Sequence, residues 1–458
     1  MKTTNLKYVF VTVLFFLNIQ IQAATIYVDV FATGTNNGTT WTDAYTDLQT
    51  AITQSTYGDV IRVSEGIYTK SSSYTLKDGV KIYGGYPNST SIPFLAQYPH
   101  HRNSLRNSKN YITTMTVQYQ NPVILNSGTS LDSQTIVDGV KIRGKYALNI
   151  GSSSVSNATI TPLFNSCDFE GDYSGGDPTS VPIGININDL INLVKPSFIN
   201  CTFSNFGLGV KLNSSINSTN APQFIKCKFF NLETGVVIGN NVGNIHPLFD
   251  KCDFYDIDNV LWLALRGNTC STEFEPLFLN SIFYNNETIL FTDQGSTCDD
   301  IAIKLSNCTL FDNGTSFRYP IYFWKNPSFS STMNDTNSTK ALRLENCISW
   351  NNLNTNGDLM SIDNGMYVEI ENTLLEANSS FSNGTSSDPV FVIPNGHPTI
   401  NRVRDLGNCI YNQNPMFVNP STTGIPNLKL QNTSPARNAG NNTFIPTGVT
   451  HDYGNTYR

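Results

Sequence analysis

The amino-acid sequence predicts an all-β fold, a single-stranded right-handed parallel β-helix (solenoid) with a short N-terminal capping helix. A phrase of the form Pro-x-Phe-x-x-Cys-x-Phe recurs through residues 162–348, and successive cysteine slots lie 25 to 39 residues apart. Self-similarity at about 20–50 residues is typical of a stacked repeat array. Between these phrases, apolar and polar residues alternate with period two in short runs, which indicates strands. The slots are Cys167, Cys201, Cys227, Cys252, Ser281, Cys308 and Cys347.

Each repeat supplies two or three short strands. In the second copy, Cys201 and Phe203 point to one side of a strand and Thr202 to the other. One such repeat cannot enclose a core, but stacked repeats bury a continuous one and hydrogen-bond each strand to the coils above and below. A β-propeller needs blades of about 40–50 residues, which is longer than most of these steps. The Leu-x-x-Leu-x-Leu phrase of leucine-rich repeats is absent.

Residues 41–55 carry apolar side chains at helical spacing, and Thr40 or Thr42 is placed to cap the start of a helix. We expect this helix to cover the first coil, whose strand edge is otherwise unpaired.

Residues 1–23 are predicted to be a signal peptide. Lys2 and Lys7 give a positively charged start, a short apolar run follows, and Ala23 is the small residue at the expected cleavage point. The β-helix domain then comprises residues 24–458, and we expect it to be secreted, at the cell surface or elsewhere outside the cell. No later stretch is apolar for long enough to cross a membrane.

The cysteines fall into two groups. Those in the repeat slots are expected to stack inside the solenoid as small apolar side chains. Cys270 and Cys298 instead lie in polar loops at equivalent places of adjacent coils, and we predict a disulfide between them. Cys409 has no obvious partner.

Segments near both ends of the chain carry a family resemblance. At the N-terminus these are Ile26-Tyr-Val-Asp29 and Gly58-Asp-Val-Ile-Arg-Val63, and at the C-terminus Asn414-Pro-Met-Phe-Val418 and the run 434–442. The chain resembles secreted right-handed parallel β-helix proteins of the pectin-lyase-like fold, of the bacterial surface type. The resemblance implies architecture, because this fold carries lyases, glycoside hydrolases, esterases and adhesins alike.

Composition restricts the partners. Charged residues make up 14% of the chain and the net charge is −7, so nucleic acid, which attracts basic patches, is not an expected partner. The five histidines lack zinc-ligand spacing, and the carboxylates do not cluster as a calcium site requires. The sequence therefore predicts neither a metal nor another cofactor.

Candidate catalytic residues are sparse. A glycoside hydrolase needs two carboxylates about 5–9.5 Å apart, whereas Asp168 and Asp253 share an outward column three coils apart, at about 14 Å. A lyase needs a base and a cation to neutralise a uronate carboxylate. Lys141 and Arg143 alternate outward on one strand, with Lys81 expected in register with Lys141. The alternative for this pair is a solvated strand edge.

A binding surface has a clearer signal. An aromatic residue stands three positions after several of the slots, and strict alternation points it outward. Such a column offers sugar rings a broad apolar surface with little loss of entropy. The alternative is that these side chains fold inward or are covered by a loop. The column consists of Phe230, Tyr255, Tyr284, Phe311 and Trp350, and a weaker second strip of Val237, Leu261, Leu290 and Tyr322.

The sequence thus favours a protein that binds extracellular polysaccharide or a cell-surface glycan without evident catalytic residues. The alternative is a carbohydrate-active enzyme, a polysaccharide lyase acting on uronate-containing polymers.

Overall fold

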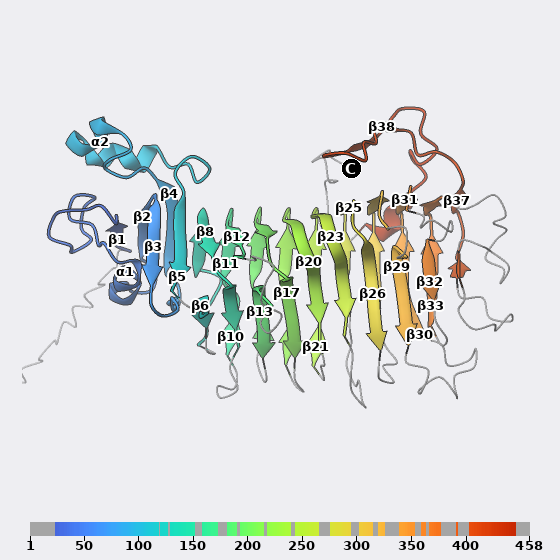
Figure 1. Ribbon diagram of the computed structural model, residues 1–458, viewed down its shortest axis with the longest axis horizontal. Coiled ribbons are helices and arrows are strands. Elements are labelled where there is room, and N and C mark those ends of the chain that lie inside the picture. The colour runs from blue at the N-terminus through green and yellow to red at the C-terminus, as the bar shows by residue number, and fades with distance from the viewer. Residues whose placement is uncertain are drawn as a thin grey trace, which may run out of the picture.

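Strands of successive coils stack into parallel sheets along the whole molecule (Figure 1). The structure, a computed structural model, describes residues 23–118, 120–126, 129–151, 158–172, 181–189, 193–214, 218–239, 243–264, 275–294, 302–314, 319–325, 339–352, 359–362, 366–376, 391–392 and 403–445. The fold is a right-handed parallel β-helix, which confirms the predicted fold class. No helix in this described part is long and apolar enough to span a bilayer.

Sheet A carries the strand that precedes each cysteine slot. Its strands within the described ranges are β1 (Thr25–Val28), β2 (Val60–Ser64), β4 (Lys81–Tyr86), β7 (Ile136–Asp138), β11 (Leu163–Asn165), β15 (Ser197–Ile199), β19 (Gln223–Ile225), β22 (Leu248–Asp250), β24 (Leu277–Leu279), β27 (Ile303–Ser306), β30 (Thr339–Glu345), β33 (Met366–Glu371) and β36 (Val403–Asp405).

Sheet B follows the slot, and most coils give it two strands in succession. The first set is β3 (Gly66–Lys70), β5 (Thr113–Val117), β8 (Val140–Arg143), β12 (Asp168–Glu170), β16 (Thr202–Ser204), β25 (Ile282–Tyr284), β28 (Thr309–Phe311), β31 (Ile348–Trp350), β34 (Leu374–Leu375) and β37 (Ile410–Tyr411). The second set is β6 (Pro122–Asn126), β9 (Tyr146–Ile150), β13 (Ile183–Asp189), β17 (Leu208–Ser214), β26 (Thr288–Gln294), β29 (Ile321–Lys325), β32 (Met360–Ile362) and β35 (Phe391–Val392). Two long strands, β20 (Lys228–Ile238) and β23 (Asp253–Leu263), run through both sets.

Sheet C is short and closes the coil between the other two. Its strands are β10 (Thr159–Ile160), β14 (Leu193–Val194), β18 (Thr219–Asn220) and β21 (Asn244–Ile245).

Two stacks of phenylalanine rings fill the solenoid. In each stack the ring centroids of neighbouring coils lie 4.7–5.1 Å apart and the ring planes are within 13° of parallel. Each of these five coils therefore adds one aromatic ring to each side of the core, which links neighbouring repeats by packing as well as by hydrogen bonds. The stacks are Phe164, Phe198, Phe224, Phe249 and Phe278 on sheet A, and Phe169, Phe203, Phe229, Phe254 and Phe283 on sheet B.

The slot cysteines stack beside these rings as free, buried thiols, as predicted. Burial raises the pKa of the Cys167, Cys201 and Cys227 thiols well above the usual value. Because Leu374 and Ile410 are register partners, Cys409 follows Thr373 in the same slot and continues the stack. The repeat thus extends two phrases, at Thr373 and Cys409, beyond the last slot of its sequence signature.

Asparagine makes the corners of the coil. The residue before each slot and the residue after each outward aromatic have positive φ, as at Asn307 (57°) and Asn351 (58°), a conformation that asparagine tolerates better than most residues. Inside the second corner, Asn286 donates to Asn313 Oδ1 (2.8 Å) and Asn313 to Asn352 Oδ1 (2.8 Å). These buried amides satisfy one another from coil to coil.

The N-terminal cap is a shorter helix than predicted. Helix α1 (Leu48–Gln54) begins after Asp47, whose carboxylate accepts from Thr50 N (2.6 Å), and not after Thr40 or Thr42. The preceding residues form a loop because Asp43 accepts from Thr35 N (2.9 Å), which holds that segment in a turn. Of the predicted signal peptide, only Ala23 is among the described residues. Cys270 and Cys298 both lie outside the described residues.

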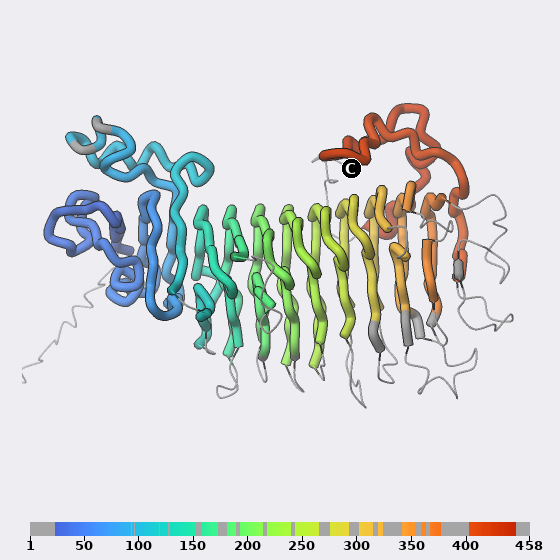
Figure 2. The backbone as a smooth tube through the Cα atoms, in the orientation of Figure 1, coloured from blue at the N-terminus to red at the C-terminus, as the bar shows by residue number. Residues whose placement is uncertain are grey.

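Two excursions project beyond the same side of the coil stack (Figure 2). Near the N-terminus, residues 87–112 leave sheet A and contain α2 (Pro93–Gln97) and the 3₁₀ helix η1 (Pro99–Ser104). Arg102 of this segment is buried and pairs with Asp29 at 2.7 Å. Near the C-terminus, residues 415–445, here called the strap, contain the antiparallel hairpin β38 (Phe417–Asn419) and β39 (Asn427–Leu430) and the 3₁₀ helix η4 (Asn442–Phe444).

Candidate functional site

Strand register places outward side chains of sheet B in two adjacent columns along the solenoid. One column holds the residue directly after each slot and the other the residue three positions after it. We call the part of both columns before the strap the open track. It consists of Lys141, Asp168, Thr202, Lys228 and Asp253 in the first column, and Arg143, Glu170, Ser204, Phe230 and Tyr255 in the second.

The predicted basic pair lies at one end of the open track. Lys141 contacts Glu170, while Arg143 lies 3.5 Å from Glu170 and 2.8 Å from Asp172. Both cations are therefore already paired with carboxylates of the next coil.

Lys81 does not join this pair, which corrects one expectation. It lies on β4 of sheet A, in register with Ile136. The phrases at 78–83 and 138–143 look alike, but the first enters a strand of sheet A and the second turns the corner from sheet A to sheet B. The 60-residue separation is thus not a whole number of coils.

Charge on the open track is balanced. Three cations, Lys141, Arg143 and Lys228, face three carboxylates, Asp168, Glu170 and Asp253. Thr202 donates to Asp168 at 2.7 Å, so the polar groups also bind one another along the column. Such a surface presents many hydrogen-bond donors and acceptors without a dominant sign of charge.

The aromatic column begins at Phe230. The rings of Phe230 and Tyr255 lie 5.1 Å apart and 2° from parallel, and those of Tyr255 and Tyr284 lie 4.9 Å apart. Ring faces therefore turn toward one another along the solenoid, and ring edges turn outward. On the side toward β16, the register partner of Phe230 is Ser204, which is buried. This differs from a platform of open faces, because the same 4.8 Å coil spacing that aligns the rings also stacks them.

Tyr255 remains half-buried and keeps its proton. Burial, followed by the negative charge of Asp253, raises the pKa of its hydroxyl. At neutral pH the hydroxyl is therefore a neutral donor beside the Asp253 carboxylate.

Beyond Tyr255 the column is covered. Tyr284 and Phe311 are buried, and Phe417 of the strap packs edge-on against Phe311 with ring centroids 5.8 Å apart. Trp350 is half-buried in the same cluster, which Leu428 and Leu430 complete. The five predicted aromatics thus lie in one column, in which Tyr284 and Phe311 are buried and Phe230, Tyr255 and Trp350 are exposed in part.

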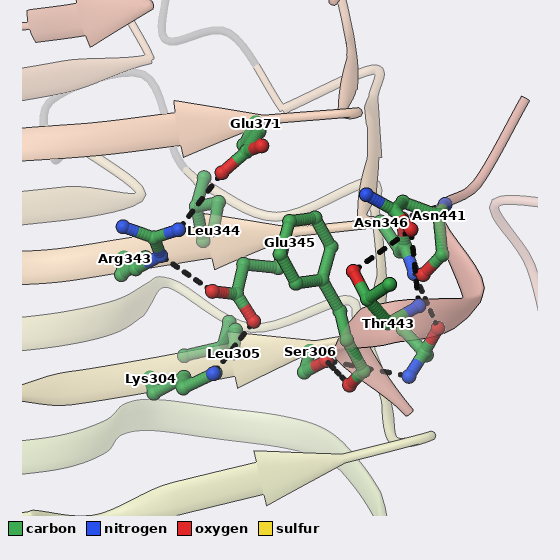
Figure 3. Close-up of polar contacts among 12 residues, drawn as sticks. Lys304, Leu305, Ser306, Arg343, Leu344, Glu345, Asn346, Glu371, Asn441 and Thr443 are labelled. Atoms are coloured by element: carbon green, nitrogen blue, oxygen red, sulfur yellow. Dashed lines mark hydrogen bonds and ion pairs between the residues drawn. The ribbon is translucent and has the colours of Figure 1, made fainter. Parts of the chain in front are cut away.

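Amide hydrogen bonds fasten the strap to the coil corner (Figure 3). Asn346 accepts from Asn441 N (2.7 Å) and donates to Asn441 O (2.9 Å), and Ser306 donates to Phe444 O (3.2 Å). Next to this contact lies an ion-pair network on sheet A (Figure 3), in which buried Glu345 binds Lys304 (2.6 Å) and also contacts Arg343.

The second predicted strip has a different composition. Val237 is in register with Trp262, Trp262 with Phe291 and Phe291 with Tyr322. Leu261 and Leu290 are core residues. A one-residue shift along a strand exchanges its faces, so counting one position short put these two leucines on the outside.

Sequence reasoning did not single out four of the ten residues of the open track, Glu170, Thr202, Ser204 and Lys228. Thr202 and Lys228 each follow a slot cysteine directly, so the repeat indicates their position. These side chains differ in chemical type from one repeat to the next, so, unlike the recurring aromatics, they form no pattern that marks a site. The strap was missed because its contact with the coils joins residues 95 apart, as in Asn346 and Asn441. In the described ranges no three His, Cys, Asp or Glu side chains gather as a metal site.

Comparisons with known proteins find likeness of fold. No protein-family model matches the sequence, and no curated protein sequence is significantly similar to it. Among solved structures, pectate lyase Pel9A aligns with a TM-score of 0.44 and 13% identity, over 96% of this chain and 98% of its own. A rhamnogalacturonan lyase gives 0.35 and 10%, over 90% and 96%. A Yersinia enterocolitica exopolygalacturonase gives 0.32 and 9%, over 85% and 78%.

Proposed function

We propose that this protein binds a linear, neutral polysaccharide along the open track, outside the cell that makes it. The observation that carries the proposal is the straight register of ten outward side chains on five coils. Four coil steps of about 4.8 Å make the track about 19 Å long. An extended polymer is the ligand whose shape matches a straight, shallow row of this length.

The chemistry of the row matches sugar hydroxyls. Carboxylates such as Asp168 and Asp253 accept hydrogen bonds, and Lys228 and the Tyr255 hydroxyl donate them. The outward ring edges of Phe230 and Tyr255, both half-buried, supply apolar contact at one end. Balanced charge favours a neutral polymer over a uronate polymer or a nucleic acid, both of which require an excess of cations.

A uronate lyase is the alternative. It would use Lys141 or Arg143 against the substrate carboxylate, and the pairing of these residues with Glu170 and Asp172 opposes that role. An active lyase would have to break these ion pairs on binding. Binding without turnover requires no such rearrangement.

The extracellular setting rests on the sequence of residues 1–23, which reads as an export signal. Release from the cell and retention at its surface are both compatible with the proposed binding role. Secretion of the full chain, followed by N-terminal sequencing of the mature protein, tests this part independently of any ligand.

Affinity electrophoresis tests the binding proposal. Native gels cast with mixed-linkage β-glucan, xylan, galactomannan or homogalacturonan are expected to retard the protein with at least one neutral polymer. Tyr255→Ala is expected to weaken that binding about tenfold, or about 1.4 kcal/mol, and Lys228→Ala to weaken it severalfold. Lys195→Ala, an exposed lysine away from sheet B, serves as the matched control.

Two outcomes contradict the proposal. One is that none of the neutral polymers retards the protein. The other is that the protein releases unsaturated product from homogalacturonan, as monitored by ultraviolet absorbance, and that Lys141→Ala or Arg143→Ala abolishes this release.

A further inference from the structure

A cavity of about 930 Å³ lies between the strap and the coils that it covers. Its floor continues the first column of the open track. From Asp253 the register passes through Ile282, Thr309, Ile348 and Leu374 to Ile410. One side is the corner with the side chains of Asn280, Asn307, Asn346 and Asn372, and the strap contributes Ile425, Pro426, Leu428 and Leu430.

The shape of this cavity is that of a channel along the solenoid. Five coil steps separate Asp253 from Ile410, which makes the cavity about 24 Å long. Dividing its volume by this length leaves a cross-section of about 40 Å², or about 7 Å across. That mean width is sufficient for one extended chain.

The lining selects among extended chains. The coil backbone cannot pair with a peptide strand, because Ile282 N, Thr309 N and Ile348 N already donate to the preceding coil at 2.9–3.0 Å. Recognition is left to side chains, so addition of a peptide strand is not available. Asparagine amides recur along the corner at the coil spacing, beside an aliphatic floor, and already bind neighbouring groups: Asn280 donates to Asp250, and Asn346 donates to Asn307 and Asn441. An amide oxygen has two lone pairs, so such an oxygen can still accept from a sugar hydroxyl while the floor contacts the C–H groups of the sugar.

One asparagine side chain that lines the cavity has an oxygen without a hydrogen-bond donor. Asn372 donates to Ala439 O of the strap (3.2 Å), while its buried Oδ1 has no hydrogen-bond partner in the described part of the chain. An unsatisfied buried acceptor costs about 1–3 kcal/mol. That oxygen has almost no exposed surface, so a ligand hydroxyl bonds to it only when the strap moves away from Asn372.

The geometry points to a threaded binding mode, an inference that rests on the proposed function. The polysaccharide lies on the open track from Lys141 to Asp253 and continues beneath the strap toward Ile410, so that one linear, unbranched chain follows both parts. Together the two parts make nine coil steps, or about 43 Å.

Oligosaccharides of graded length test this mode. Calorimetric titration uses linear oligosaccharides prepared from whichever neutral polymer retards the protein. Affinity is expected to rise with extended length up to about 43 Å and then level off. Levelling off at about 19 Å, the length of the open track, would overturn the channel while leaving the proposed function intact.

A channel-filling variant provides the second test. Thr309→Trp places a large side chain on the channel floor and is expected to lower affinity for the longest oligosaccharides at least tenfold, with little effect on those of about 19 Å or less. Thr159→Trp, at an exposed position on sheet C, is the matched control.

The outcomes separate the two proposals. Equal affinity of Thr309→Trp and the unaltered protein for long oligosaccharides rejects the channel, even if Tyr255→Ala still weakens binding. If the unaltered protein binds no neutral polymer, both proposals fall. The length series needs no variant, so it decides the matter even if Thr309→Trp displaces the strap.

Discussion

Removing one ring from the core stack should destabilise the solenoid strongly. Phe229 is fully buried, with parallel rings at 4.7 Å (Phe203) and 4.8 Å (Phe254) and tilted rings of Phe224 and Phe249 at 5.5 and 5.9 Å. Truncating a buried phenylalanine to alanine costs about 3–5 kcal/mol. Coil-to-coil hydrogen bonds hold both neighbouring rings in place, so the cavity cannot collapse. We therefore expect Phe229→Ala to lower the free energy of unfolding by about 5 kcal/mol.

Urea denaturation followed by far-ultraviolet circular dichroism measures this loss. Phe94→Ala is the matched control, because Phe94 is 54% exposed on α2 and its removal should cost no more than about 0.5 kcal/mol. A loss below about 2 kcal/mol for Phe229→Ala would refute the idea that the ring stacks carry the core.

Two further predictions concern the thiols and the strap. In the folded protein the pKa of the slot thiols is raised above the ordinary value of 9.0, so their contribution to stability is complete below pH 9 and falls as the pH rises further. Cys227→Ser, which copies the natural Ser281, should reduce this alkaline loss of stability by about 1.4 kcal/mol per pH unit in urea titrations at pH 9 to 10.5. An unchanged slope of stability against pH would contradict this prediction. Phe417→Ala should remove the ring that packs on Phe311. Trypsin should then cleave the strap at Lys429 or Arg437 at least tenfold faster, while the urea midpoint of the coils stays unchanged. Equal cleavage rates of the variant and the unaltered protein would show that this ring does not hold the strap.

The coil was predictable because its rule is local and repeated. The slot cysteine, the phenylalanine two residues later and the period of about 25 residues together determine which side chains enter the core, and burial of Cys201 and Phe203 follows that rule. The rule is insensitive to how long each loop is. Register between distant phrases was less secure, as Lys81 shows, because two similar phrases can occupy different faces of the coil.

The candidate site was predictable only in part. The outward direction of Phe230 and Tyr255 follows from alternation, but their ring-to-ring stacking depends on the 4.8 Å spacing of coils in space. The cover over Tyr284 and Phe311 comes from Phe417, more than 100 positions later. No local pattern around Phe417 records that contact, so the division of the column into open and covered halves needed the structure.

A crystal structure of the protein with its tightest-binding linear oligosaccharide tests the binding track most directly. The sugar chain is expected to run parallel to the solenoid axis, over Asp168, Lys228 and Asp253, with one end beneath the strap beside Asn372. Sugar bound on sheet A or sheet C, or lying across the strands of sheet B, would contradict the assignment.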